Sequence, residues 1–151
     1  MIRLIMILAT GFYVGYLPKA PGSFGTLLAF PLHMLFSQFS LPYYALAIGL
    51  TILVGIWAAG SAEKILDLSD PGVVVIDEVA GMLITLIGAP DKPMVWFIGF
   101  VLFRFFDILK PFPIRLVDQR FHGGIGIMLD DIVAGIYSLI VLQIICRLWF
   151  E

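Results

Sequence analysis

Long apolar stretches separated by short polar or Pro/Gly-containing segments make up most of this chain. The stretches 41–60 and 132–146 contain no charged side chain. A helix needs about 20 largely apolar residues to cross the hydrocarbon core of a bilayer. We therefore predict one membrane-spanning helix over 41–60 and another that extends from Asp130 to Arg147.

Two further apolar stretches, 73–89 and 94–109, each contain two charged residues near one end. The charged residues are Asp77 and Glu78 in the first stretch and Arg104 and Asp107 in the second. Both stretches are long enough to be predicted as spans. The segment 24–39 is shorter and contains Pro31, so we expect a kinked or partial span there.

The first 12 residues are apolar but too few to cross a bilayer, and we expect them to form a short helix at the membrane interface. The pattern as a whole predicts an all-α, polytopic integral membrane bundle of about four to five spans plus this N-terminal interfacial helix. Since no repeat or low-complexity linker divides the chain, residues 1–151 are expected to form a single domain.

The composition supports a membrane protein. Hydrophobic residues make up 61% of the chain and charged residues only 13%, whereas an ordinary soluble domain is roughly a quarter charged. The apolar runs are continuous and lack the two-residue alternation of a transmembrane barrel. The net charge is −2, and we expect no nucleic-acid partner.

The segments between the predicted spans differ in charge. If 24–39 crosses the bilayer, the loops 13–23, 61–72 and 110–129 share one face. Basic residues divide unequally, with Lys19, Lys64, Lys110, Arg115 and Arg120 on this face and Lys92 and Arg147 on the other. Because excess Lys and Arg mark the cytoplasmic side, we expect the three loops to be cytoplasmic.

This topology brings the charges of three predicted helices to one depth at the cytoplasmic side. The acids are Asp77, Glu78, Asp107, Asp130 and Asp131, and the bases are Arg104 and Lys110. A charge near the bilayer centre costs about 2.5–3.5 kcal/mol on insertion scales. Three excess negative charges in a partly dehydrated setting require either protonation or a bound cation. We therefore expect a functional site there.

Small residues on the helices that carry the acids would allow the close packing that such a site needs. They are Ala80, Gly81, Ala134 and Gly135.

Carboxylate oxygens with no His or Cys nearby favour Mg²⁺, Ca²⁺ or Mn²⁺ over zinc. The candidate metal ligands are Asp77, Glu78, Asp130 and Asp131. Structural roles are the alternative. Asp130 could cap the last helix, and Arg104 and Asp107, three residues apart, could form an ion pair within their helix.

The segment GYLPKAPGSFGTL (15–27) precedes and begins the partial span. Gly22 and Gly25 would allow the backbone to approach a ligand closely. Ser23 is placed to cap the following helix, and Lys19 lies beside its free N–H groups, which together could hold a phosphate. A plain Pro/Gly turn is the alternative.

Acids for a metal and bases for a phosphate indicate phosphoryl chemistry at the membrane surface. The candidate phosphate ligands are Lys19, Ser23, Arg104, Lys110 and Arg115. The candidate catalytic residues are Asp77, Asp107, Asp131 and Arg104. The loop 110–129 contains Gly123, Gly124 and Gly126 and could fold over a substrate. We favour direct attack by water, with an aspartyl phosphate as the alternative.

Other polar residues are expected to be structural. Glu63 and Lys64 are assigned to a solvated turn, Asp70 to a loop, and His33 and His122 to structural positions.

Transport is a competing function, because buried acids and an arginine could form an ion or proton path. The outer halves of the predicted spans have little polar lining, which argues against it. A non-catalytic membrane scaffold is a third possible function, but it would not explain why five acids are gathered.

Four motifs, in the same order, resemble the phosphatidylglycerophosphatase A family. They are PKAPGSFGTL (18–27), IDEVAGM (76–82), FRFFDILKPFPI (103–114) and GGIGIMLDDIVAG (123–135). The resemblance runs from about residue 11 to residue 135. Members of this family are bacterial inner-membrane lipid phosphatases that depend on Mg²⁺ and convert phosphatidylglycerophosphate to phosphatidylglycerol.

The resemblance implies a multi-pass phosphatase of the bacterial inner membrane that acts in phospholipid biosynthesis, with its site facing the cytoplasm. The five acids fall on the family's acidic motif positions. Lys19, Arg104 and Lys110 fall on its basic positions. The partner it implies is a phospholipid substrate in the bilayer, and the oligomeric state stays open.

Overall fold

The computed structural model describes residues 1–149, and over this range the chain forms helices and no strand. The elements are α1 (Ile2–Ala9), the short 3₁₀ helix η1 (Val14–Tyr16), α2 (Pro21–Phe36), α3 (Leu41–Leu66), α4 (Ile76–Thr85), α5 (Pro93–Leu109), α6 (Ile114–Arg120) and α7 (Gly123–Trp149). The predicted all-α class is confirmed.

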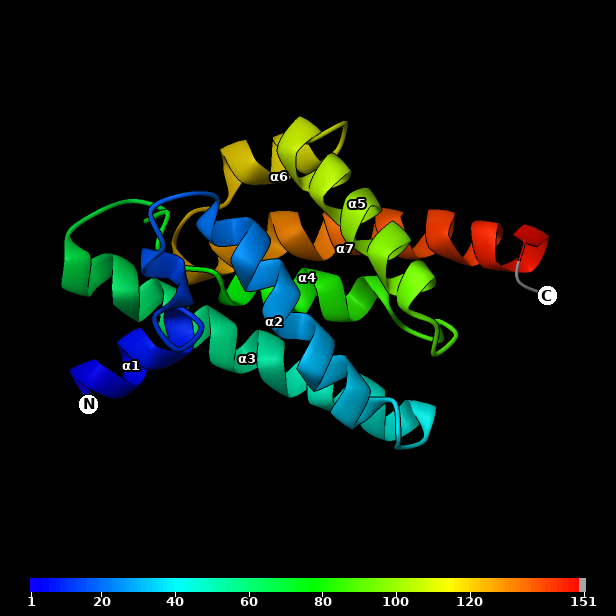
Figure 1. The fold of residues 1–151 in the computed structure, drawn as a ribbon. Helices are drawn as coiled ribbons and strands as arrows, with labels where there is room; N and C mark the ends of the chain where they lie inside the picture. The colour runs from blue at the N-terminus through cyan, green and yellow to red at the C-terminus, as the bar shows by residue number, and fades with distance from the viewer. Residues whose placement is uncertain (150–151) are drawn as a thin grey trace.

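The short helix α4 lies at the centre of the bundle (Figure 1). It packs against α7, α2 and α3, while α7 also contacts α3, α5 and α6. Every residue of α4 is buried except Asp77 and Glu78, which are half-buried in its first turn. The bundle is therefore built around a helix whose first turn carries two carboxylates.

The helix α4 is shorter than the predicted span 73–89, because it ends at Thr85. Ten residues rise only about 15 Å, so the last carbonyl groups of α4 lie inside the protein and need hydrogen-bond donors. Tyr44 Oη of α3 donates to Leu83 O at 3.0 Å, and Gln143 Nε2 of α7 donates to Ile87 O at 2.7 Å. Side chains from two long helices thus donate hydrogen bonds to carbonyl groups at and just beyond the end of α4.

His33 belongs to the same network, since its Nδ1 lies 2.8 Å from Tyr44 Oη. The imidazole is buried and also packs edge-on against the Trp96 ring. The interpretation of His33 as a structural residue agrees with these contacts.

Within residues 1–149, two helices are long and apolar enough to cross a membrane, namely α3 with 26 residues and α7 with 27. The helices α2 and α5 contain 16 and 17 residues, below the roughly 20 of a typical span.

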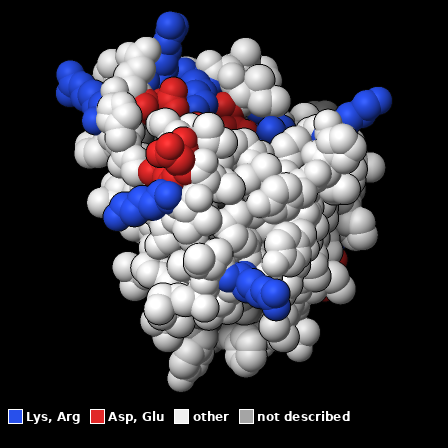
Figure 2. Space-filling view, turned by 90° about the vertical axis from the view of Figure 1, so that its left-hand side faces the viewer, with Lys and Arg blue, Asp and Glu red and all other residues white. Residues whose placement is uncertain are grey.

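Large apolar side chains cover the outer faces of the long helices. On α5 they include Phe97, Phe105 and Ile108, and on α7 Ile140 and Ile144. A water-soluble surface rarely exposes so much contiguous apolar area, so these faces indicate membrane association. In Figure 2, most visible acidic and basic side chains gather toward the upper part of one end, and the rest of that face is largely uncharged.

The predicted close approach of α4 and α7 is confirmed. A Cβ atom added to Gly135 would lie 2.5 Å from Gly81 O, and one added to Gly81 would lie 2.7 Å from Asp131 O. Either distance is too short for a side chain, so only glycine allows the two backbones this contact.

The segment 110–129 is not the loop that the sequence predicted. It contains α6 and the first two turns of α7, which begins at Gly123. Gly124 allows α7 to touch α3, since an added Cβ would lie 2.7 Å from Gly60 N. This packing outweighs the low helix propensity of glycine. Asp130 therefore lies in the third turn of α7 and does not cap the helix.

We expect Gly135→Ala to lower the free energy of unfolding by about 1–3 kcal/mol, because the added methyl group forces α7 away from α4. At about 2–4 °C per kcal/mol, the midpoint of thermal unfolding in detergent should fall measurably.

The matched control is Gly49→Ala in α3, where an added Cβ meets no atom within 4 Å. Alanine favours the helix by about 0.5–1 kcal/mol over glycine, so this variant should be unchanged or slightly more stable. Equal midpoints for the two variants would contradict the tight α4–α7 contact.

Candidate active site

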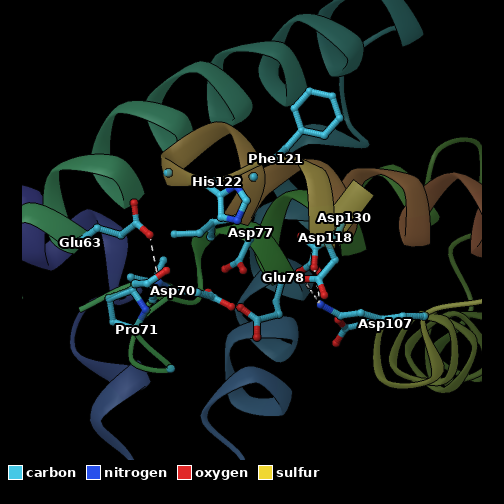
Figure 3. Close-up of a pocket in the computed structure, with 18 residues that line it drawn as sticks. Glu63, Asp70, Pro71, Asp77, Glu78, Asp107, Asp118, Phe121, His122 and Asp130 are labelled. Atoms are coloured by element: carbon cyan, nitrogen blue, oxygen red, sulfur yellow. Dashed lines mark hydrogen bonds and ion pairs between the residues drawn. The ribbon is translucent and has the colours of Figure 1, made fainter. Parts of the chain in front are cut away.

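A pocket of about 280 Å³ lies where α4, α5 and α7 bring their charged residues together (Figure 3). The end of α3, the loop that follows it, and α6 complete the walls. The acidic residues that line it are Glu63, Asp70, Asp77, Glu78, Asp107, Asp118, Asp130 and Asp131. Lys110 is the one Lys or Arg lining it in the part of the chain that the structure describes. All five acids that the sequence placed at one depth thus share this pocket.

Asp77 and Glu78 lie in the first turn of α4, where the free N–H groups of a helix favour negative charge. A hydrogen bond to the end of α1 holds the start of α4 in place, because the Val75 N–H donates to Ala9 O at 2.9 Å. This contact with α1 helps to position the Asp77 and Glu78 carboxylates in the pocket.

Three carboxylates form the innermost group, which we call the acidic triad: Asp77, Glu78 and Asp131. One oxygen from each lies within 4.8 Å of the others. Asp131 is only 3% exposed. Asp77 Oδ1, Glu78 Oε2 and Asp131 Oδ2 are buried and accept no hydrogen bond from the described residues.

Buried carboxylate oxygens without partners are unfavourable unless a cation or proton joins them. Their hard oxygen chemistry and spacing fit Mg²⁺ or a similar divalent ion. The acidic triad is therefore the group of described residues that could hold a metal. Its members are three of the four predicted ligands, and their role in binding a metal stays a prediction.

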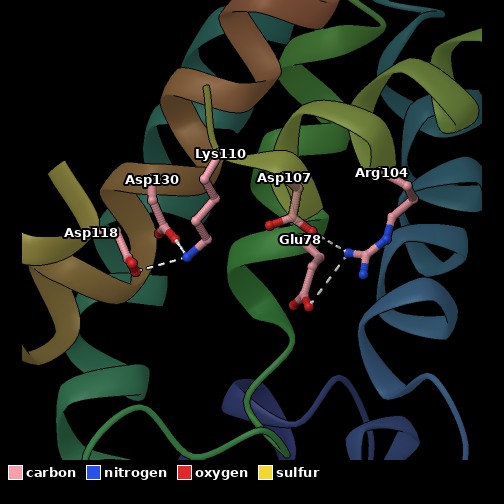
Figure 4. Close-up of polar contacts among 6 residues, drawn as sticks. All are labelled: Glu78, Arg104, Asp107, Lys110, Asp118 and Asp130. Atoms are coloured by element: carbon pink, nitrogen blue, oxygen red, sulfur yellow. Dashed lines mark hydrogen bonds and ion pairs between the residues drawn. The ribbon is translucent and has the colours of Figure 1, made fainter. Parts of the chain in front are cut away.

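The fourth predicted ligand, Asp130, is not part of the acidic triad, and its carboxylate points toward Lys110 (Figure 4). Lys110 Nζ lies 2.7 Å from Asp130 Oδ2 and 2.7 Å from Asp118 Oδ1. Burial alone would lower the pKa of the Lys110 ammonium, but these two hydrogen bonds outweigh burial and raise it. Lys110 thus stays charged and joins α5, α6 and α7.

Arg104 forms the second ionic group, with Nη1 2.6 Å from Asp107 Oδ2 and 3.8 Å from Glu78 Oε1 (Figure 4). The predicted ion pair between Arg104 and Asp107 is confirmed. Gly22 allows the first turn of α2 to pack against this group. A Cβ added to Gly22 would overlap Glu78 Oε1 and lie 3.2 Å from Arg104 Nη1.

Like Arg104, the remaining predicted phosphate ligands lie outside the pocket lining. Lys19, before α2, and Arg115, on α6, are exposed. Ser23 is the third residue of α2 and does not cap it, which corrects the prediction. The cap position falls on Ala20 because Pro21, with its fixed φ, takes the first helical position.

Four ionisable lining residues were missed as site candidates: Glu63, Asp70, Asp118 and His122. Glu63 is not in a solvated turn, because α3 continues to Leu66 and Glu63 Oε1 accepts a hydrogen bond from the Asp70 N–H at 3.0 Å. The small-residue run 58–62 could have predicted this longer helix. No sequence spacing indicates that Asp118 pairs with Lys110.

The fold and pocket define an all-helical, membrane-associated protein with a buried acidic site. The family model described as Phosphatidylglycerophosphatase A matches residues 7–146. Phosphatidylglycerophosphatase A of Escherichia coli (strain K12) is 41% identical over 144 residues, covering 95% of this chain and 84% of that protein. The Haemophilus influenzae protein of the same name is 39% identical, covering 91% and 85%. The chain belongs to the phosphatidylglycerophosphatase A family, as its motifs indicated.

Another relative has a different name. A Bacteroides thetaiotaomicron protein named "Putative phosphatidylinositol-3-phosphatase" is 40% identical over 148 residues, covering 92% of this chain and 91% of that protein. No solved structure matches the chain.

With divalent cations removed by a chelator, we expect Asp131→Asn to raise the midpoint of thermal unfolding by about 2–4 °C. The substitution removes one of three mutually repelling buried charges, worth about 1 kcal/mol or more. Differential scanning fluorimetry in detergent would measure the change.

Asp118→Asn is the comparison variant, because it weakens the partly exposed ion pair with Lys110. It should lower the free energy of unfolding by under about 1 kcal/mol, so the midpoint should stay unchanged or fall by at most about 2–4 °C. A lower midpoint for Asp131→Asn would mean that the acidic triad is not electrostatically strained.

Proposed function

We propose that this protein is a Mg²⁺-dependent lipid phosphatase that hydrolyses phosphatidylglycerophosphate to phosphatidylglycerol and phosphate, in phospholipid biosynthesis. The observation that carries the proposal is the acidic triad, three carboxylates within 4.8 Å with buried, unpartnered oxygens. Its occurrence in a chain of the phosphatidylglycerophosphatase A family supports the substrate.

The proposed substrate would remain in the bilayer while its headgroup enters the pocket. The exposed apolar faces of α3, α5 and α7 support this arrangement, because they offer lipid contact on the elements that also border the pocket.

The proposed setting is the bacterial inner membrane, crossed about four to five times, with α1 at the interface and the pocket facing the cytoplasm. The helices α2 and α5 would complete crossings together with the turns beside them. The shorter α4 would be tolerated because it is buried in protein and its last carbonyls are satisfied by α3 and α7.

In the proposed reaction, Asp77, Glu78 and Asp131 bind the cation. Bound Mg²⁺ supplies charge for the phosphoryl oxygens and lowers the pKa of water. Asp107 holds the Arg104 guanidinium at 2.6 Å, so that Arg104 can stabilise negative charge developing on the phosphoryl group. Direct attack by water is favoured over an aspartyl phosphate.

The other candidate phosphate ligands are placed differently from Arg104. Lys110 is engaged by Asp118 and Asp130 and would reach a phosphate only by exchanging one of them. Lys19, Ser23 and Arg115 would act outside the pocket lining, as groups that attract an approaching headgroup.

Two other functions are considered, namely hydrolysis of a different phospholipid and ion transport. The name of the Bacteroides relative favours phosphatidylinositol 3-phosphate as a second candidate substrate. The relative kcat/KM for the two lipids separates them. The ion-transporter alternative finds no support in the relatives' names.

We expect purified protein to release phosphate from a short-chain phosphatidylglycerophosphate with Mg²⁺ and to lose this activity in chelator. Asp77→Asn and Asp131→Asn should each lower turnover by a factor of about 100 or more, as expected when a group that stabilises transition-state charge is removed. Size-exclusion profiles should show that both variants still fold.

Asp67→Asn is the matched control, since Asp67 lies outside the 280 Å³ pocket and its left-handed backbone (φ 52°) suits asparagine. It should retain full activity. Full activity in Asp77→Asn and Asp131→Asn would show that the acidic triad is not the active site, and no turnover by the unmodified protein would refute the proposed substrate.

The orientation can be tested by single cysteines in a background with Cys146 replaced by Ser. Gln119→Cys on α6 and Asp91→Cys before α5 are both exposed and lie on opposite predicted faces. In intact cells, a membrane-impermeant maleimide should label position 91 and spare position 119. The opposite pattern would reverse the proposed orientation.

A further inference from the structure

His122 lies at the mouth of the pocket, on the two-residue connection between α6 and α7. In Figure 3 its imidazole points into the pocket, above the Asp77 carboxylate. Among the described residues that line the pocket, it is the one imidazole, and the others that ionise are carboxylates and Lys110.

Three glycines fix this connection in place. Gly123 adopts φ +73°, which turns the chain from the connection into α7. Gly126 lets the Phe121 carbonyl lie against the first turn of α7, because an added Cβ would overlap Phe121 O and lie 2.6 Å from its carbon. Gly124 packs against α3 at Gly60. His122 therefore extends from a connection that is flanked by close backbone contacts.

Most other ionisable groups among the described residues of the pocket are already engaged. The Lys110 ammonium already donates to Asp118 and Asp130 at 2.7 Å. Carboxylates that hold a divalent cation must be ionised and can only accept. Asp107, Asp118 and Asp130 are also acceptors, because each pairs with Arg104 or Lys110. An arginine guanidinium is not deprotonated in proteins. Yet the alkoxide expelled from a phosphate monoester needs a proton as its bond to phosphorus breaks.

The position of His122 matches the place where that proton is needed. Asp131 of the acidic triad is nearly inaccessible, whereas His122 and Phe121 are exposed at the mouth. A phosphate held at the acidic triad must direct its ester oxygen outward, since the rest of the lipid remains outside the pocket. The ester oxygen then faces the side on which His122 lies.

We propose that His122 is a catalytic residue that donates a ring N–H proton to the leaving oxygen of the lipid headgroup. This inference rests on the proposed function. The P–O bond to the headgroup breaks, its electron pair stays on the leaving oxygen, and the proton from His122 completes the free alcohol. Water forms the new P–O bond and releases one proton to solvent, from which His122 is reprotonated.

The test compares two short-chain lipids that differ in the atom joining phosphorus to the headgroup. One is phosphatidylglycerophosphate, and the other has sulfur in place of the bridging oxygen. A thiolate is a far weaker base than an alkoxide, with a thiol pKa of about 8.5 in cysteine, so its departure needs no proton donor.

For His122→Gln, we expect kcat on the oxygen lipid to fall by about 100- to 10,000-fold, the usual contribution of general acid catalysis. On the sulfur lipid, the same variant should remain within about tenfold of the unmodified protein. Phe121→Leu is the matched control, because it alters the same connection without a proton donor. Any loss it causes should be equal on the two lipids.

Each other outcome contradicts the inference. An equal loss on both lipids would assign His122 a structural role, and no loss would assign it no role. Failure of the unmodified protein to hydrolyse the sulfur lipid, while it hydrolyses the oxygen lipid, would also count against a leaving-group role. No hydrolysis of the oxygen lipid by the unmodified protein would instead refute the proposed function.

Discussion

The electrostatic conflict within the acidic triad is the constraint on which the rest of the structure depends. One oxygen each of Asp77, Glu78 and Asp131 lies within 4.8 Å of the others, and each residue has a buried oxygen that no group within residues 1–149 satisfies. Burying like charges together opposes folding unless a cation or a proton is bound. The fold nevertheless holds them there, through the glycine contact between α4 and α7 and through hydrogen bonds that allow α4 to end inside the bundle. Such strain is typical of sites kept for chemistry.

The basic residues near the acidic triad form ion pairs mainly with other acids. Lys110 is held between Asp118 and Asp130. Arg104 is held by Asp107 at 2.6 Å and reaches the triad only at Glu78, at the longer distance of 3.8 Å. The negative charge at the centre therefore stays available for a cation, while the bases stabilise the surrounding helices. The helices α3, α5 and α7 also carry exposed apolar faces, so the molecule combines a candidate cation site with an apolar surface suited to lipid. A lipid phosphate would suit this combination, because its phosphate can bind a cation and its acyl chains can contact the apolar faces.

The sequence predicted the helical class, the meeting of the five acids and the glycine contact, because each follows from a strong local signal. Apolar runs need helices in a membrane, and clustered charges in such runs must avoid lipid. The sequence failed where tertiary packing decides. The glycines of 123–126 indicated a loop but form α7, because they allow contact with α3 and with Phe121. Asp118 entered the site only through its pairing with Lys110, which no spacing along the chain indicates.

An experimental density map of the protein with Mn²⁺ and a phosphate mimic tests the central claim most directly. The account predicts a cation coordinated by oxygens of Asp77, Glu78 and Asp131, at distances of about 2.0–2.2 Å for a hard divalent ion, with the mimic beside it. A cation bound elsewhere, or three carboxylates that point apart around an empty space, would contradict it.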